Sequence, residues 1–204
     1  NLENVPSPLL LMVHGYGSNE QDLFSFSRAI PENFTIISLR GDIEFQYNEY
    51  AWYNIFWDHS GVKSYDIEKA KKSRDNILKS LDICKDLYEI DPDNITLMGF
   101  SQGAMLVNAV ALTYPEKIKN IISLSGAFDP YIINLSNSKY LKKLSFYISH
   151  GLNDEILPFD FSKKSLKILD DNNLNYIFEE YPIGHSVSPD NFKSMLNWLI
   201  EKTN

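Results

Sequence analysis

The sequence of 204 residues is poor in cysteine and in long apolar runs, and each shortage excludes a class of protein. Cys84 is the sole cysteine, so the chain has no internal disulfide and no cysteine-based zinc site. We expect Cys84 to be a core residue rather than a reactive thiol, because it shares a helical face with Leu81 and Leu87. No apolar run reaches the roughly 18 residues that a membrane-spanning helix needs, which predicts no stable membrane insertion.

Positive charge is also scarce, with 19 Lys and Arg residues against 27 Asp and Glu residues and a net charge of −8. An acidic surface repels phosphate backbones, so nucleic acid is not an expected partner. No signal peptide is recognisable, and together with the lack of a disulfide this predicts a cytoplasmic protein. With 44% hydrophobic residues, the chain suits one domain over residues 1–204.

Short apolar runs alternate along the chain with segments of helical periodicity. The predicted strands are 9–13, 35–39, 95–98, 121–124, 146–149 and 176–181. The predicted helices are 19–29, 64–89, 102–114, 159–171 and 192–199. Asn19 can cap the first of these helices, and Asp91-Pro92 ends the second. Nearly continuous apolar strands that alternate with helices predict an α/β fold with a mostly parallel central sheet flanked by helices.

Residues 99–104 read GFSQGA and place a serine between two glycines directly after a predicted strand. A serine hydroxyl is a poor nucleophile until a neighbouring base takes its proton, and it must be exposed on a sharp strand-to-helix turn. Small residues two positions before and after the serine relieve the crowding of such a turn. Because the motif also opens a predicted helix, Ser101 is the candidate nucleophile.

The partners of such a serine follow it in the order acid, then histidine. Only His150 and His185 follow Ser101, and His185 lies in the loop between the last predicted strand and the last helix. We predict that His185 is the base. Asp154, in the loop after the preceding strand, is the best candidate for the acid, and Asp129 is the alternative.

The reaction also needs backbone donors for the oxyanion that forms on the substrate. One is expected from the N–H of the residue after the nucleophile, Gln102. The other is expected from the loop after the first strand, HGYGS at residues 14–18, where we choose the N–H of Tyr16.

Six ordered motifs now resemble those of one family: HGYGS, AWYNI at 51–55, GFSQGA, SLSG at 123–126, HGLNDEILP at 150–158 and GHSVSP at 184–189. The chain resembles the phospholipase/carboxylesterase family of α/β-hydrolases over nearly its whole length. That family includes acyl-protein thioesterases, lysophospholipases and small bacterial carboxylesterases. The resemblance implies an α/β-hydrolase fold, the triad Ser101, Asp154 and His185, and an oxyanion hole from the amides of Tyr16 and Gln102.

The chain departs from the family pattern at several positions. Ala104 replaces a second glycine, and Tyr16 and Ser18 stand where many members have Leu and Asp. The Tyr16 side chain would narrow the acyl site, which argues against long-chain thioesters. Residues 1–8 are too short and proline-rich for the two strands that usually begin this fold, so we expect either a sheet reduced at its N-terminal edge or a sequence cut at its N-terminus.

An aromatic-rich insertion at about 41–64 separates the second strand from the next predicted helix. It suits a wall over the active site, a self-packed loop or a homodimer contact. The resemblance places Trp52 near the acyl site, and we expect substrate to contact the side chains of Tyr16, Trp52, Tyr53 and Leu157. Asp58 and His59 are too few to make a metal site, and no metal is expected.

These observations predict a serine carboxylesterase that hydrolyses short- to medium-chain carboxylic esters through an acyl-enzyme, with a small-molecule acyl ester as its partner and no cofactor. The alternatives are an acyl-protein thioesterase, a lysophospholipase or a non-catalytic ligand-binding relative. The intact set of Ser101, Asp154 and His185 argues against the non-catalytic relative, because a binding protein has no physical need for all three.

Overall fold

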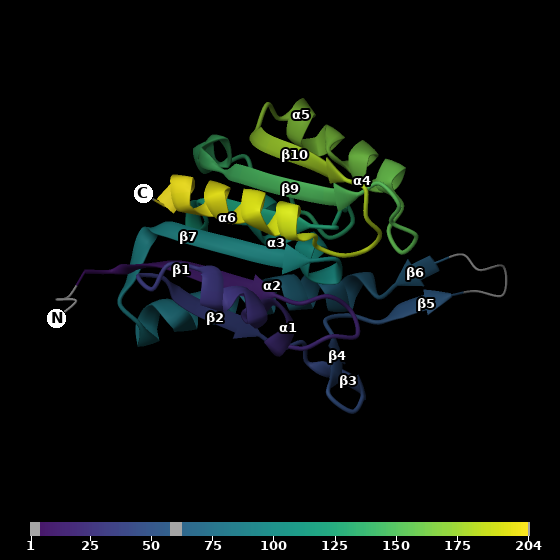
Figure 1. Cartoon of the computed structure of the whole chain (residues 1–204), viewed down its shortest axis with the longest axis horizontal. Coiled ribbons are helices and arrows are strands. Elements are labelled where there is room, and N and C mark those ends of the chain that lie inside the picture. The colour runs from purple at the N-terminus through teal and green to yellow at the C-terminus, as the bar shows by residue number, and fades with distance from the viewer. Residues whose placement is uncertain (1–4, 58–62, 204) are drawn as a thin grey trace.

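The computed structural model describes residues 5–57 and 63–203. Its centre is a six-stranded sheet in the order β10-β9-β8-β7-β1-β2, in which every neighbouring pair is parallel (Figure 1). The strands are β1 (Ser7–Val13), β2 (Thr35–Leu39), β7 (Ile90–Phe100), β8 (Asn120–Leu124), β9 (Ser145–Gly151) and β10 (Asn175–Tyr181). Each contains one of the six predicted strands, so the α/β architecture is confirmed.

Helices cover both faces of this sheet. They are α1 (Gln21–Phe24), α2 (Ile67–Leu87), α3 (Gln102–Thr113), α4 (Phe159–Ser165), α5 (Lys167–Asp171) and α6 (Pro189–Thr203), with short 3-10 helices η1 (Ser25–Ala29), η2 (Pro115–Lys117) and η3 (Lys139–Lys143). Figure 1 shows α6 crossing one face of the sheet, and α2 and α3 lie on the other.

The alternation of side chains along β1 divides the core into two. Leu9 and Leu11 belong to the apolar cluster that includes α2 and α3, whereas Leu10 and Met12 belong to the cluster that includes α1 and α6. A strand with both faces covered must be apolar at consecutive positions, which is why this run lacks a polar alternation.

Two predicted boundaries were wrong for identifiable reasons. The helix expected from residue 64 begins at Ile67, because Lys63–Tyr65 forms a strand and the Asp66 carboxylate caps the helix by accepting from the Lys69 N–H over 2.9 Å. Asp91 and Pro92 lie inside β7 rather than in a turn. They fall where the pairing with β1 is irregular, so the missing N–H of the proline is tolerated.

The aromatic insertion consists of two antiparallel hairpins that the sequence analysis did not predict. One pairs β3 (Ile43–Gln46) with β4 (Glu49–Ala51), and the other pairs β5 (Ile55–Trp57) with β6 (Lys63–Tyr65). Both lie at the end of the molecule where the strands of the sheet terminate (Figure 1). Asp58 and His59 lie outside the described residues.

Cys84 is buried in the core against the sheet, as expected for a structural residue. The first described strand, β1, lies between β7 and β2 in the sheet. Within residues 5–57 and 63–203, no helix has both the length and the apolar character that crossing a bilayer takes.

Candidate active site

The carboxyl ends of parallel strands meet at one edge of a sheet, and the predicted site residues converge there. Ser101 follows β7, Asp154 follows β9 and His185 follows β10. The Ser101 Oγ lies 2.8 Å from His185 Nε2, and His185 Nδ1 lies 2.6 Å from Asp154 Oδ2. Three side chains separated by up to 84 positions therefore form one continuous line of hydrogen bonds.

Ser101 occupies a strained turn between β7 and α3. Its φ of 52° and ψ of −115° lie in a region that non-glycine residues rarely adopt. The turn brings the start of α3 against β1 so closely that a Cβ on Gly103 would lie 2.0 Å from the Val13 carbonyl oxygen. The glycine two positions after the serine is thus a packing requirement of the turn that exposes the hydroxyl.

The hydrogen bonds of Asp154 fix the tautomer of His185. The Asp154 side chain is fully buried, and its Oδ1 accepts from the backbone N–H groups of Ile156 and Leu157 over 2.9 and 2.8 Å. Oδ2 is left to accept from the Nδ1–H of His185. The Nε2 of His185 is then the unprotonated nitrogen and can accept the Ser101 proton.

A second histidine, His150, also touches the triad carboxylate. Its Nε2 lies 2.8 Å from the Leu157 carbonyl oxygen and 3.2 Å from Asp154 Oδ2, both of which are acceptors. Nε2 therefore carries the proton, and Nδ1 is buried without a partner among the described residues. Burial lowers the pKa of His150, so the ring is a neutral support for the Asp154 loop.

The amides expected to hold the oxyanion are available. Neither the Tyr16 N–H nor the Gln102 N–H donates to a protein acceptor in the part of the chain that the structure describes. The N–H of Gly41 donates to His14 Nε2 over 3.0 Å, so His14 Nδ1 carries the ring proton and donates to the Gly15 carbonyl over 2.7 Å. Burial lowers the pKa of His14, which keeps this loop support neutral.

The Gln102 side chain connects the serine turn to the aromatic insertion. Its Oε1 accepts from the Trp52 N–H over 2.9 Å, and its Nε2 donates to the Tyr53 carbonyl over 2.8 Å. A side-chain amide can satisfy the backbone groups of two neighbouring residues in this way. The segment therefore has a fixed position relative to the nucleophile.

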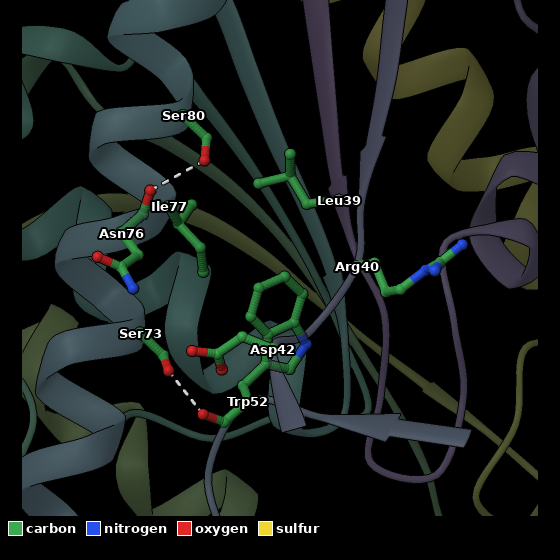
Figure 2. A pocket seen from close by; sticks show the side chains of 8 residues that line it. All are labelled: Leu39, Arg40, Asp42, Trp52, Ser73, Asn76, Ile77 and Ser80. Carbon is green, nitrogen blue, oxygen red and sulfur yellow. Dashed lines mark hydrogen bonds between the residues drawn. The ribbon is translucent and has the colours of Figure 1, made fainter. Parts of the chain in front are cut away.

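Trp52 does not line the cavity around Ser101, contrary to our expectation. Its ring packs near Leu39 and Ile77 at a separate cavity of about 110 Å³ between β2 and α2 (Figure 2). The indole N–H donates to the His14 carbonyl over 2.9 Å, and the Ser73 hydroxyl donates to the Trp52 carbonyl over 2.6 Å. The physical reason is that the buried indole needs an acceptor, which the His14 carbonyl at the start of the oxyanion loop supplies.

The other expected substrate contacts do line a cavity of about 710 Å³ that reaches Ser101 and His185. Tyr16, Tyr53 and Leu157 form part of its wall, and the Tyr16 ring stacks on Phe45 with 5.0 Å between centroids. Asp129, the alternative acid, also lines this cavity, but its carboxylate accepts from the Tyr65 hydroxyl rather than from His185.

Within residues 5–57 and 63–203, no group of three or more His, Cys, Asp or Glu side chains could hold a metal ion. The line of hydrogen bonds from Ser101 to Asp154 is instead suited to nucleophilic chemistry by the serine. The strained turn and the free amides add an exposed hydroxyl and donors for a developing negative charge.

The sequence profile of the Phospholipase/Carboxylesterase family matches residues 3–203. The chain belongs to this family. The solved structure of a carboxylesterase from Bacillus cereus is similar to this chain, with a TM-score of 0.83 and 22% sequence identity. The match covers 96% of this chain and 89% of that one. This likeness confirms the α/β-hydrolase fold.

Curated members of the family align over part of their length. An acyl-protein thioesterase 1 from Aspergillus fumigatus is 32% identical over 154 residues, which cover 67% of this chain and 62% of that protein. A probable carboxylesterase, SOBER1-like, from Arabidopsis thaliana is 31% identical over 116 residues, 55% of this chain and 44% of that protein. The aligned segment spans less than two thirds of each of these two relatives.

Sequence reasoning missed three supports of the site, namely the His14 ring, the Gln102 side chain and His150. All three stand inside motifs that were recognised for other reasons, HGYGS, GFSQGA and HGLNDEILP. The side chains of His14 and Gln102 bind backbone groups of segments 27 to 50 positions away, which no local pattern indicates.

Proposed function

We propose that the protein is a serine carboxylesterase that cleaves short- to medium-chain carboxylic esters. The observation that carries the proposal is the Ser101–His185–Asp154 line, with 2.8 Å and 2.6 Å between its hydrogen-bonding atoms, on a turn that exposes the serine. The apolar lining of the 710 Å³ cavity suits the hydrocarbon part of an ester.

In the proposed mechanism, His185 Nε2 takes the Ser101 proton as Oγ attacks the ester carbonyl carbon. Negative charge moves to the carbonyl oxygen, and the N–H groups of Tyr16 and Gln102 stabilise it. Collapse of this intermediate breaks the bond to the alcohol, which receives the proton from His185. Asp154 holds the ring in the correct tautomer and stabilises the transient imidazolium.

The second half of the reaction repeats these roles with water. His185 removes a proton from a water molecule, whose oxygen attacks the acyl-enzyme carbonyl. The second tetrahedral intermediate releases the carboxylic acid, and the proton returns from His185 to Ser101. Each step uses only side chains and amides of this chain and needs no added cofactor.

The proposal is tested with p-nitrophenyl esters from acetate to palmitate, using the wild type and Ser101→Ala. Loss of the nucleophile should lower kcat by about 10⁶. Ser125→Ala is the matched control, because Ser125 also follows a strand and also has a positive φ, of 49°, without a bond to His185. Equal slow hydrolysis by wild type and Ser101→Ala would contradict the proposal.

A fluorophosphonate probe separates an active site from an inactive one without a choice of substrate. An activated Ser101 should be labelled in the wild type and not in Ser101→Ala. An unlabelled wild type that still binds apolar ligands would favour the non-catalytic relative.

An acyl-protein thioesterase is the second candidate, because the relative from Aspergillus fumigatus carries that name. The Tyr16 ring, stacked on Phe45 at the cavity wall, favours shorter acyl groups. Rates on matched oxygen esters and thioesters of octanoate and palmitate separate the two candidates. A preference for the palmitoyl thioester would support the acyl-protein thioesterase function and contradict the carboxylesterase function.

A cytoplasmic location and a homodimer also remain proposals. The single cysteine is compatible with a reducing compartment. Exposed aromatic side chains of the insertion, such as Tyr47 and Phe56, would suit a contact between two copies. Sedimentation of the full chain at several concentrations measures whether it dimerises.

A further inference from the structure

One buried carboxylate in the active-site cavity has no part in the proposed mechanism. Asp129 comes from the loop after β8 and lines the cavity that reaches Ser101, although only 7% of the residue is exposed. Its Oδ1 accepts from the Tyr131 N–H over 2.9 Å, and its Oδ2 accepts from the Tyr65 hydroxyl. Both partners donate, as expected around an ionised carboxylate.

Among the side chains that the structure describes, which do not include those of Trp57 and Lys63, no basic group forms an ion pair with Asp129. Arg74 reaches the same loop, but it donates to the Ile132 carbonyl over 2.7 Å and pairs with Asp75 over 2.8 Å. A buried carboxylate is costly unless a cation or several donors balance it. The cavity therefore offers a position where a bound cation is favourable.

Two tyrosine rings stand beside this carboxylate in the cavity wall. The rings of Tyr53 and Tyr65 are 5.2 Å apart at an angle of 47°. Burial, and then the charge of Asp129, raise the pKa of both hydroxyls, so both tyrosines stay neutral. Neutral tyrosine rings attract an ammonium group through the negative charge on their faces.

We propose that Asp129, Tyr53 and Tyr65 form a subsite for an ammonium group carried by the ester substrate. The carboxylate supplies the counter-charge, and the rings supply faces that contact the methyl or methylene groups around the nitrogen. The inference rests on the proposed esterase function and adds to it a substrate class, the amine-bearing esters. A neutral ester of the same shape leaves the carboxylate unbalanced and is the poorer substrate.

Matched pairs of esters test the subsite on the full chain. One pair is acetylcholine and dimethylbutyl acetate, in which a tert-butyl group replaces the trimethylammonium group of the alcohol. The other is the p-nitrophenyl esters of aminohexanoate and heptanoate, which differ in charge at the end of the acyl chain. We expect a kcat/KM about 10- to 100-fold higher for the ammonium ester in at least one pair, the range of a hydrogen bond to a charged group.

The Asp129→Asn variant ties the preference to this carboxylate. The readout is the ratio of kcat/KM within a pair, so a general loss of active protein cancels, and we expect the ratio to fall to about one. Asp22→Asn removes the same charge from an exposed position in the cavity wall, where Asp22 accepts from the Ser18 hydroxyl over 2.8 Å. This control should keep the wild-type ratio.

Three outcomes overturn the inference. A wild type that fluorophosphonate labels but that shows no preference in either pair overturns the subsite alone. If the ratio of kcat/KM within a pair falls equally in Asp22→Asn and Asp129→Asn, the preference comes from the overall negative charge of the cavity and not from the subsite. A wild type that is neither labelled nor active overturns the proposed function and the subsite together.

Discussion

The loops at the carboxyl ends of the sheet and the insertion beside them are held in different ways. We call residues 14–18, 99–104, 150–158 and 184–186 the catalytic floor, and residues 41–57 and 63–66 the aromatic wall. Buried hydrogen bonds and close backbone contacts fix the floor, as at Asp154 and Gly103. The wall consists of two short hairpins whose exposed aromatics include Tyr47 and Phe56. Part of the wall is held as firmly as the floor, because the Gln102 side chain and the His14 carbonyl bind the segment at Trp52 and Tyr53. The difference lies in the exposed side chains of the hairpins, which can change without disturbing the proposed catalytic residues.

The largest expected effect comes from the acid of the floor. Asp154→Asn should lower kcat by about 10⁴, because an amide NH₂ facing His185 Nδ1 favours the tautomer that cannot accept the Ser101 proton. Asp129 lies on the side of the cavity next to the aromatic wall. On a neutral p-nitrophenyl ester, the fold-loss of kcat in Asp129→Asn should be smaller than the fold-loss in Asp154→Asn by a factor of at least about 10³. A larger loss in Asp129→Asn would make Asp129 the acid instead. Single-turnover kinetics with fluorophosphonate titration of active sites measures both.

A second test compares two glycines. Gly103→Ala places a Cβ 2.0 Å from the Val13 carbonyl oxygen, a backbone atom that cannot rotate away, and should lower the free energy of unfolding by about 3 kcal/mol or more. Gly17→Ala, where the floor meets the wall, meets only Phe45 at 3.7 Å and should cost about 1 kcal/mol for its φ of 78°. Urea denaturation gives both values. Equal losses would show that the floor is no more tightly constrained than its border with the wall.

The same contrast explains what the sequence could predict. Ser101, Asp154 and His185 follow from local motifs, because each must end a strand of a parallel sheet and so must meet the others at one edge. The six strands were recognisable because burial on both faces leaves continuous apolar runs. These requirements are local, and a single sequence displays them.

The wall could not be predicted in the same way. Trp52 and Tyr53 are neighbours of similar chemistry, and the side chain of one packs on α2 while the other lines the cavity. Their directions depend on the Gln102 side chain and the His14 carbonyl, which belong to distant segments. The short strands of the hairpins carry aromatics without a clear alternation, so their register depends on tertiary neighbours.

Trp52 and Tyr53 supply the next test. Trp52→Phe leaves the His14 carbonyl without its donor and should lower the free energy of unfolding by about 2 kcal/mol, yet the preferred acyl chain length should not change. Tyr53→Ala widens the substrate cavity and should move the preferred p-nitrophenyl ester to a longer chain. Initial rates across the ester series and urea denaturation measure both. A change in the preferred acyl chain length in Trp52→Phe would mean that the Trp52 side chain does affect substrate binding.

The smallest expected effect is the change of the free energy of unfolding with pH, which we expect to arise from the buried histidines of the catalytic floor. Burial lowers the pKa of His14 and of His150, whereas residues 41–57 and 63–66 contain no histidine. Below a pH of about 6.5 the unfolded chain binds a proton at each position and the folded chain does not. The free energy of unfolding should therefore fall with falling pH, by up to about 1.4 kcal/mol per pH unit for each histidine, until the lowered folded pKa is reached.

His150→Gln isolates one of these two contributions. The glutamine amide can still donate to the Leu157 carbonyl, as His150 Nε2 does over 2.8 Å, but it cannot take up a proton. Urea denaturation at pH 7.5, 6.5 and 5.5 should show a shallower loss of stability in the variant than in the wild type, whatever its stability at pH 7.5. An identical slope would mean that His150 is protonated in the folded protein as readily as in the unfolded chain. Its partnerless Nδ1 makes that costly, because an added proton there would find no acceptor among the described residues.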